Sequence, residues 1–328
     1  MKPKLSVIIC TFNRDKSLKK CLESLAQQTF SHFEVIIIDG GSTDNTNNII
    51  LKYSKKLKIK KVIYKKKELS RVRDQGWRKA KGKFISWIDD DVIVSKNWAE
   101  SIVKILDNHA DIAGVSGPTI VPQKLLQNRD VFSFYHQSGF IGLLGKFWNY
   151  FFLEGEKFEV GKIFKSGAWS PGSNLPSSLK IKGLKEVDYL EACNMTLRRD
   201  LIVKVDGFDY EYTGIAEWSE LDLAMRIKEL GYRLVFSSKI KVNHNISQEG
   251  VYSRRVQAKK RMENFFKFYF RHIFKFRIDY VFKFLSYLLF LNCYWIYKTI
   301  TTKNFDWLGG LLGTFKGVKY IYKKVNQK

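Results

Sequence analysis

Three consecutive carboxylates, Asp89, Asp90 and Asp91, directly follow the apolar run FISWI at residues 84–88. Like charges this close repel one another unless a cation neutralises them, and hard oxygen ligands suit Mg²⁺ or Mn²⁺. In proteins such an ion usually joins carboxylates to substrate phosphates. An acidic turn with an Asp at a helix N-cap explains the same residues, because helix-like sequence begins at Val92. The three residues alone favour these two interpretations equally.

The elements that must position these acids follow from apolar runs that alternate with helical patterns. The runs lie at residues 5–10, 35–38, 61–64 and 84–88, and residues 71–80 have helical spacing. Such alternation about every 30 residues indicates βαβ units and a parallel sheet. Ligands bind beyond the carboxyl ends of the strands in these sheets. Asp39 and the three aspartates fall at those ends, which favours a functional site there.

The second half of the chain begins with a less regular, Gly-rich stretch at 118–185, expected to cover a site. Beyond it the pattern predicts strands at 187–190, 194–198 and 233–236. A helix is predicted at 219–230, and a last strand ends at His244.

Several sequence motifs occur in an order typical of one enzyme family. They are VIICTFNR, VIIIDGGSTD, Arg73, FISWIDDDV, VDYLEACNMTLRRD, DGFD, EWSELDLAMRIKELGY and VNH. In this order they resemble the family 2 glycosyltransferases with the GT-A fold, from about Lys4 to Asn245. The resemblance implies an α/β fold with a mostly parallel central sheet flanked by helices in residues 1–250. Residues 118–185 are then an excursion on the acceptor side.

The resemblance also implies a site for a nucleotide-sugar, with a UDP-sugar as the expected donor. Asp39 matches the acid that accepts from the base, and Arg73 matches the arginine near the diphosphate. Asp89 and Asp91 match the outer members of the DxD motif, and His244 matches a late histidine that completes coordination of Mn²⁺ or Mg²⁺. The other residues assigned to donor binding are Thr11, Phe12, Asn13 and Arg14 in the first-strand loop, and Asp90. Two positions depart from the family pattern: Gly40 stands where Asp or Asn is common, and Asp74 replaces the usual Asn.

Sugar transfer needs a carboxylate that takes the proton of the acceptor hydroxyl. The family places an Asp in a Glu-Asp-x-Asp-Leu pattern, whereas residues 219–223 read Ser-Glu-Leu-Asp-Leu. Glu220 is therefore the predicted catalytic base of an inverting, in-line transfer, with Glu217 as the reserve candidate. Asp222 is expected to cap or hold the helix. An acid that is merely favoured by the helix dipole is the alternative for Glu220.

The charge of the chain is uneven. Of 57 basic and 32 acidic residues, which give +25, residues 251–328 hold 17 and 3. Lys267, Arg271 and Lys275 recur every four residues among many aromatics, which is helical spacing. The uncharged stretch 284–297 would span roughly 21 Å as a helix, short of a ~30 Å hydrocarbon core. Residues 251–328 are therefore predicted to be helices on an anionic membrane surface, with packing on the catalytic part or on a second subunit as the alternative.

The remaining expectations concern partners and location. The four cysteines have no metal-ligand spacing and no secretory signal is recognised, so a reducing, cytosol-facing location is expected. The expected acceptor is a glycan or polyprenyl-linked glycan, at the inner face of the cell membrane, to which the protein attaches peripherally. A basic nucleic-acid-binding protein and a GT-A-like scaffold without catalysis are the alternatives. No nucleic-acid module is recognised, so nucleic acid is not an expected partner.

Overall fold

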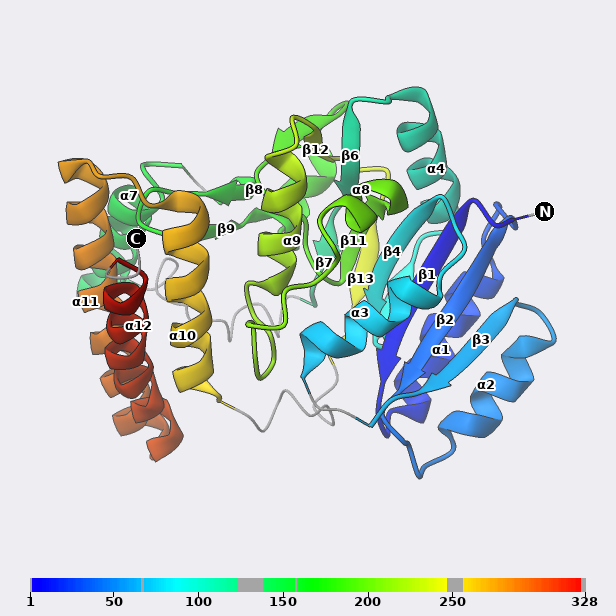
Figure 1. Ribbon diagram of the computed structural model, residues 1–328, viewed down its shortest axis with the longest axis horizontal. Helices are drawn as coiled ribbons and strands as arrows, with labels where there is room; N and C mark the ends of the chain where they lie inside the picture. The colour runs from blue at the N-terminus through cyan, green and yellow to red at the C-terminus, as the bar shows by residue number, and fades with distance from the viewer. Residues whose placement is uncertain (1, 66–67, 123–137, 157, 247–255, 326–328) are drawn as a thin grey trace.

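The computed structural model describes residues 2–65, 68–122, 138–156, 158–246 and 256–325. Within them, eight strands form one sheet in the order β10-β12-β6-β11-β4-β1-β2-β3 (Figure 1). In that order they are β10 (Lys185–Val187), β12 (Arg233–Phe236), β6 (Ile112–Ser116), β11 (Asn194–Arg198), β4 (Phe84–Asp89), β1 (Leu5–Thr11), β2 (Phe33–Asp39) and β3 (Ile59–Ile63). The only antiparallel neighbours in this sheet are β11 with β4 and β6, and β10 with β12. The predicted mostly parallel sheet is confirmed.

Helices cover both faces of this sheet, because β1 and β2 are apolar and buried on both sides. One face packs against α1 (Asp15–Ala26), α2 (Thr46–Ser54) and α4 (Trp98–Asn108), through residues such as Leu18 and Ile102. The other packs against α3 (Leu69–Lys79), α8 (Arg199–Lys204) and α9 (Ser219–Lys228), through residues such as Trp77 and Ile227.

Short elements occupy the connections. A three-stranded sheet contains β5 (Val92–Val94), β13 (Val242–His244) and β7 (Thr119–Ile120), in that order. The excursion contributes α7 (Gly139–Phe152), the hairpin of β8 (Val160–Ile163) and β9 (Trp169–Pro171), and the 3₁₀ turns Gly172–Asn174 and Pro176–Lys180. Its residues 123–137 lie outside the described residues. The sequence after Val92, expected to be helical, first forms β5, and the helix begins at Trp98.

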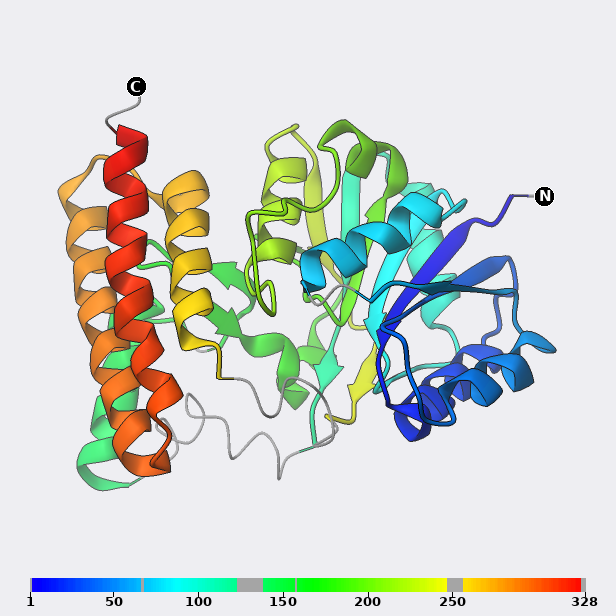
Figure 2. The same ribbon diagram turned by 60° about the horizontal axis from the view of Figure 1, so that its bottom comes forward.

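The C-terminal region is helical, as predicted. Its elements are α10 (Ala258–Phe268), a π-helical turn (Tyr269–Ile273), α11 (Ile278–Thr302), a 3₁₀ turn (Phe305–Leu308) and α12 (Gly309–Val325). These helices and α7 gather at the end of the molecule opposite the N-terminus (Figures 1 and 2). They share one apolar core with the chain around Trp218, just before α9. Of the helices in the described ranges, none is both long and apolar enough to cross a membrane.

Candidate active site

The sheet register brings the predicted site residues to one edge. Thr11 at the end of β1 is the lateral partner of Asp39 at the end of β2. Cys10 is the partner of Asp89 at the end of β4. Strand β13 pairs with β5 so that His244 lies opposite Val92, next to the acidic turn. Four segments far apart in the sequence therefore meet at the carboxyl ends of the central strands, where the sequence places the ligand.

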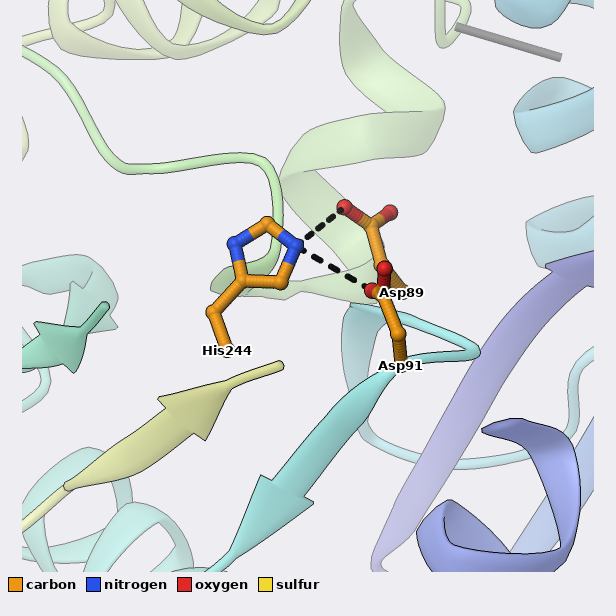
Figure 3. Close-up of side chains that lie close together, drawn as sticks. All are labelled: Asp89, Asp91 and His244. Carbon is orange, nitrogen blue, oxygen red and sulfur yellow. Dashed lines mark ion pairs between the residues drawn. The ribbon is translucent and has the colours of Figure 1, made fainter. Parts of the chain in front are cut away.

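Asp89, Asp91 and His244 converge as a possible metal site (Figure 3). His244 Nε2 lies 3.1 Å from Asp91 Oδ1 and 4.0 Å from Asp89 Oδ2. Ligands of an octahedral ion at ~2.1 Å stand roughly 3 Å apart when adjacent and ~4.2 Å apart when opposite. The three ligand atoms lie within 4.8 Å of one another. Two carboxylates and one imidazole are also a donor set that Mn²⁺ accepts, so the residues fit the predicted ion.

The same three groups hold one another electrostatically. Burial on its own would raise the pKa of Asp91, but His244 and Arg14 lower it below its ordinary value. Burial would lower the pKa of His244, but Cys193, Asp91 and Asp89 raise it to about 11. Asp91 is therefore ionised, as a metal ligand must be, and His244 would have to release its proton before it could bind the ion.

Asp90 is the most enclosed of the three aspartates. Thr11 Oγ1 donates to its Oδ2 at 2.7 Å, and Arg14 Nη1 lies 2.9 Å from its Oδ1. Arg14 Nη2 also donates to Asp91 Oδ2 at 2.5 Å. Burial raises the pKa of Asp90 to about 7, although Arg14 and Thr11 oppose the shift. Thr11 and Arg14, which the sequence assigns to donor binding, thus also hold the acidic turn in place. A contact between Asp90 and the donor stays a prediction.

The first-strand loop faces the loop after β2. Asn13, in the left-handed region at φ 52°, accepts from the Thr43 N–H, and its own N–H donates to Ser42 Oγ. Phe12 is 43% exposed, and a Cβ added at Gly40 would lie 3.1 Å from its ring. An exposed ring held on an ordered loop can stack on a nucleotide base. Glycine at position 40, where the family commonly has Asp or Asn, therefore leaves room for the ring of Phe12.

Asp39 is buried and already has several partners. Its Oδ1 accepts from the N–H groups of Gly41 and Ser42, and Lys61 Nζ lies 3.0 Å from its Oδ2. Burial would raise the pKa of Asp39, but Ser42 and Lys61 lower it. The carboxylate is an acceptor, as base recognition requires. Sequence reasoning missed Lys61, because its approach to Asp39 depends on the pairing of β2 with β3.

Arg73 links the acidic turn to α9. Its guanidinium forms an ion pair with Glu220, and its Nη2 lies 4.0 Å from Asp89 Oδ1. Both Arg73 and Glu220 are buried. The predicted diphosphate ligand, the predicted base and the first acid of the metal cluster are therefore neighbours, although they lie in three separate segments of the sequence.

The other acids of this region have different environments. Asp222 is fully buried and accepts from Tyr212, Arg226, Arg271 and His272. It holds the helix in place, as its predicted role requires. Glu217 pairs with Arg261 of α10 at 3.0 Å and points to the C-terminal region instead. Of the three acids, Glu220 is the one paired with Arg73.

The fold is shared with solved glycosyltransferase structures. TarS of S. aureus (residues 1–349, with UDP-GlcNAc) superposes with a TM-score of 0.62 at 18% identity, over 96% of this chain and 81% of that one. The mannosyltransferase PcManGT of Pyrobaculum calidifontis, with GDP-Man and Mn²⁺, has a TM-score of 0.56 at 15% identity, over 96% and 88%. The protein has the GT-A glycosyltransferase fold.

Sequence comparison finds relatives of the same kind. Residues 6–157 match the family described as Glycosyl transferase family 2. Chondroitin synthase of Pasteurella multocida (strain Pm70) is 29% identical over 243 residues, which are 70% of this chain and 23% of that protein. The putative glycosyltransferase EpsH of Bacillus subtilis (strain 168) is 32% identical over 111 residues, 34% and 32% of the two chains. The chain thus spans about a quarter to a third of these relatives.

Proposed function

We propose that this protein is an inverting glycosyltransferase that moves a sugar from a nucleoside-diphosphate donor to an acceptor hydroxyl. The observation that carries the proposal is the position of the Arg73 guanidinium between the carboxylates of Glu220 and Asp89. The match of residues 6–157 to Glycosyl transferase family 2 supports transfer chemistry, and the solved structures with UDP-GlcNAc and GDP-Man concern proteins of the same fold. A UDP-sugar is the donor proposed here.

The roles of the residues follow from this arrangement. A donor diphosphate beside Asp89 would attract Arg73, and the ion pair with Glu220 would then open. The released Glu220 carboxylate can accept the proton of the acceptor hydroxyl as its oxygen attacks the anomeric carbon. Arg73 stabilises the charge that develops on the departing nucleoside diphosphate. Mn²⁺ or Mg²⁺ held by Asp89, Asp91 and His244 would supply further positive charge at that diphosphate.

The first test is a panel of UDP- and GDP-sugars with Mn²⁺, Mg²⁺ or a chelator, with release of nucleoside diphosphate as the readout. With the best donor, Glu220→Gln is expected to lower kcat by about 10²–10⁴-fold. Donor binding measured by calorimetry should persist, because Glu220 is proposed to contact the acceptor and not the donor. Glu220→Asp, which restores the family's usual residue, should retain measurable turnover.

Two outcomes would contradict the proposal. Near-normal turnover of Glu220→Gln with intact donor binding would show that Glu220 is not the catalytic base. If turnover were lost in Glu217→Gln and not in Glu220→Gln, Glu217 would be the base instead. No metal-dependent release from any donor would favour a scaffold without catalysis. RNA retention without donor binding would favour a nucleic-acid-binding protein.

We further propose that the acceptor is a glycan or polyprenyl-linked glycan, reached while the protein rests on the inner face of the cell membrane. The support is the helical end of the molecule. Exposed apolar side chains occur along α7, α11 and α12, and include Phe140, Phe147, Leu285, Leu289 and Phe315. Aromatic contacts such as Phe151–Phe282 hold α7 against α11. Apolar side chains beside exposed lysines are typical of helices that lie in a bilayer interface.

A further inference from the structure

The C-terminal helix α10 lies along the segment that leads into α9. Asn264 exchanges hydrogen bonds with the backbone of Thr213, and Lys267 Nζ donates to the carbonyl of Glu211. The ring of Trp218, the residue before α9, packs on Phe265 and Phe268 at centroid distances of 5.3 and 5.0 Å. Contacts therefore recur about once per turn of α10 and end at the start of the helix that carries Glu220.

The π-helical turn after α10 continues these contacts onto α9 itself. Arg271 Nη1 donates to Asp222 Oδ1 at 2.8 Å and to Asp209 Oδ2 at 2.7 Å. His272 Nε2 lies 2.9 Å from Asp222 Oδ1, and its Nδ1 lies 2.8 Å from Glu229 Oε1. One inserted residue turns two successive side chains, Arg271 and His272, towards the same carboxylate, as a π-helical turn permits. Asp222 is thereby held by the C-terminal region.

The geometry of α9 relates this contact to Glu220. Residues two positions apart on an α-helix project roughly 200° apart, so Glu220 and Asp222 face nearly opposite sides. Trp218 at φ 80° and Ala216 at φ 52° place the chain before α9 in the left-handed region, and no side chain caps the helix. The orientation of α9 about its axis therefore depends on side-chain contacts such as those of Asp222.

We propose that Arg271 and His272 are positioning residues, which hold Asp222 so that Glu220 on the other side of α9 meets the acceptor hydroxyl. The proposal rests on the assignment of Glu220 as the base. It also gives the basic C-terminal stripe a second role: Lys267 and Arg271 lie against the catalytic part, while the helical turn ends at Ile273, before Lys275. Misplacement of a reacting group by about 1 Å can cost about 10²-fold in rate.

The test uses the full-length protein with Arg271→Met, Arg271→Lys and, as the matched control, Arg277→Met. Arg277 is an exposed tail arginine that pairs with Asp279 and not with α9. We expect Arg271→Met to lower kcat about 10–100-fold for the best donor of the panel, with KM and binding of UDP with Mn²⁺ unchanged. Arg271→Lys, which keeps a cation near Asp209 and Asp222, should recover most of the loss, and Arg277→Met should equal the wild type.

Hydrogen exchange provides a readout that needs no donor. In Arg271→Met, amides of residues 209–224 should exchange faster while those of β1 and β2 stay protected. Unchanged kcat in Arg271→Met beside an inactive Glu220→Gln would overturn the positioning role and leave the base assignment standing. Full activity of Glu220→Gln would instead overturn the base assignment. Faster exchange throughout the central sheet would show a role in the whole fold, and would also overturn the proposal.

Discussion

At the residue scale, Asp91 combines two properties that make it the most informative member of the cluster. It is buried, and its Oδ1 lies 3.1 Å from His244. Asp91→Asn removes the charge and keeps the shape, so affinity for Mn²⁺ should fall at least tenfold because a neutral amide is a weaker ligand. Titration of the free Mn²⁺ signal in electron paramagnetic resonance measures this directly.

Asp107→Asn is the matched control for this substitution. Asp107 is a carboxylate that pairs with Lys4 and Lys83 and lies outside the cluster. Its replacement should leave the affinity for Mn²⁺ unchanged. Equal affinity in wild type and Asp91→Asn would exclude Asp91 as a ligand, whatever the effect on turnover.

Part of the candidate site could be predicted from the sequence because the motifs carry residue type and order. Asp89, Asp91 and His244 meet as the resemblance implies. The pairs that join separate segments could not be predicted. These pairs are Arg14 with Asp90 and Asp91, and Arg73 with Glu220. Such pairs depend on side-chain direction and strand register, which spacing alone does not give.

At the scale of elements, Gly76 sets the distance between α3 and the central strand β1. A Cβ at this position would lie 2.4 Å from Ile8 Cγ2, and Ile8 is fully buried. Gly76→Ala should therefore push α3 from the sheet and lower the free energy of unfolding by about 1–3 kcal/mol, despite the better helix propensity of Ala. Urea denaturation followed by circular dichroism measures the change.

Lys79→Ala tests the same helix without the close contact, since Lys79 is exposed on α3. Its effect should stay within about 0.5 kcal/mol. A Gly76→Ala protein as stable as the wild type would show that α3 can shift freely. Arg73, one turn earlier on α3, would then have no fixed position relative to the metal cluster.

The accuracy with which a strand is predicted depends on its length and on the pattern of its residues. The strands 194–198 and 233–236 are confirmed with the same bounds; the first alternates polar and apolar residues, and the second contains the apolar run Leu234–Phe236. Strand β5, which has three residues and lies between the acidic turn and α4, could not be predicted separately. Three residues show too little alternation to be distinguished from the start of a helix. Its pairing with β13, which places His244, is a tertiary contact.

At the scale of the whole molecule, the C-terminal region faces both inward and outward. The sequence indicated its helices and its charge, but periodicity defines a helix face and not its neighbour. The structure pairs Arg271 with the buried Asp222 and packs the aromatic side chains Phe265 and Phe284 into the interior. Exposed residues of α11 and α12 form the outward side. The proposed membrane contact therefore belongs to α7, α11 and α12, and the inner face of α10 belongs to the catalytic part.

The outward side of α12 leads to a prediction for membrane binding. Lys319 and Lys323 are exposed on α12 near the exposed side chains Phe315 and Tyr322. Each lysine near an anionic surface contributes about 1 kcal/mol, so the double substitution Lys319→Glu and Lys323→Glu should weaken binding at least tenfold. Sedimentation with vesicles that contain phosphatidylserine measures the affinity, and vesicles of phosphatidylcholine alone should bind weakly in every case.

Lys19→Glu with Lys20→Glu gives the same change of net charge on α1, at the other end of the molecule, where both lysines are exposed. This control should bind the anionic vesicles almost as the wild type does, because charges beyond the ~10 Å Debye length are screened. If the two double variants lost affinity equally, the attraction would reflect net charge alone. If neither the wild type nor the control bound, the helical end would not be a membrane surface, and its apolar side chains would then need another partner.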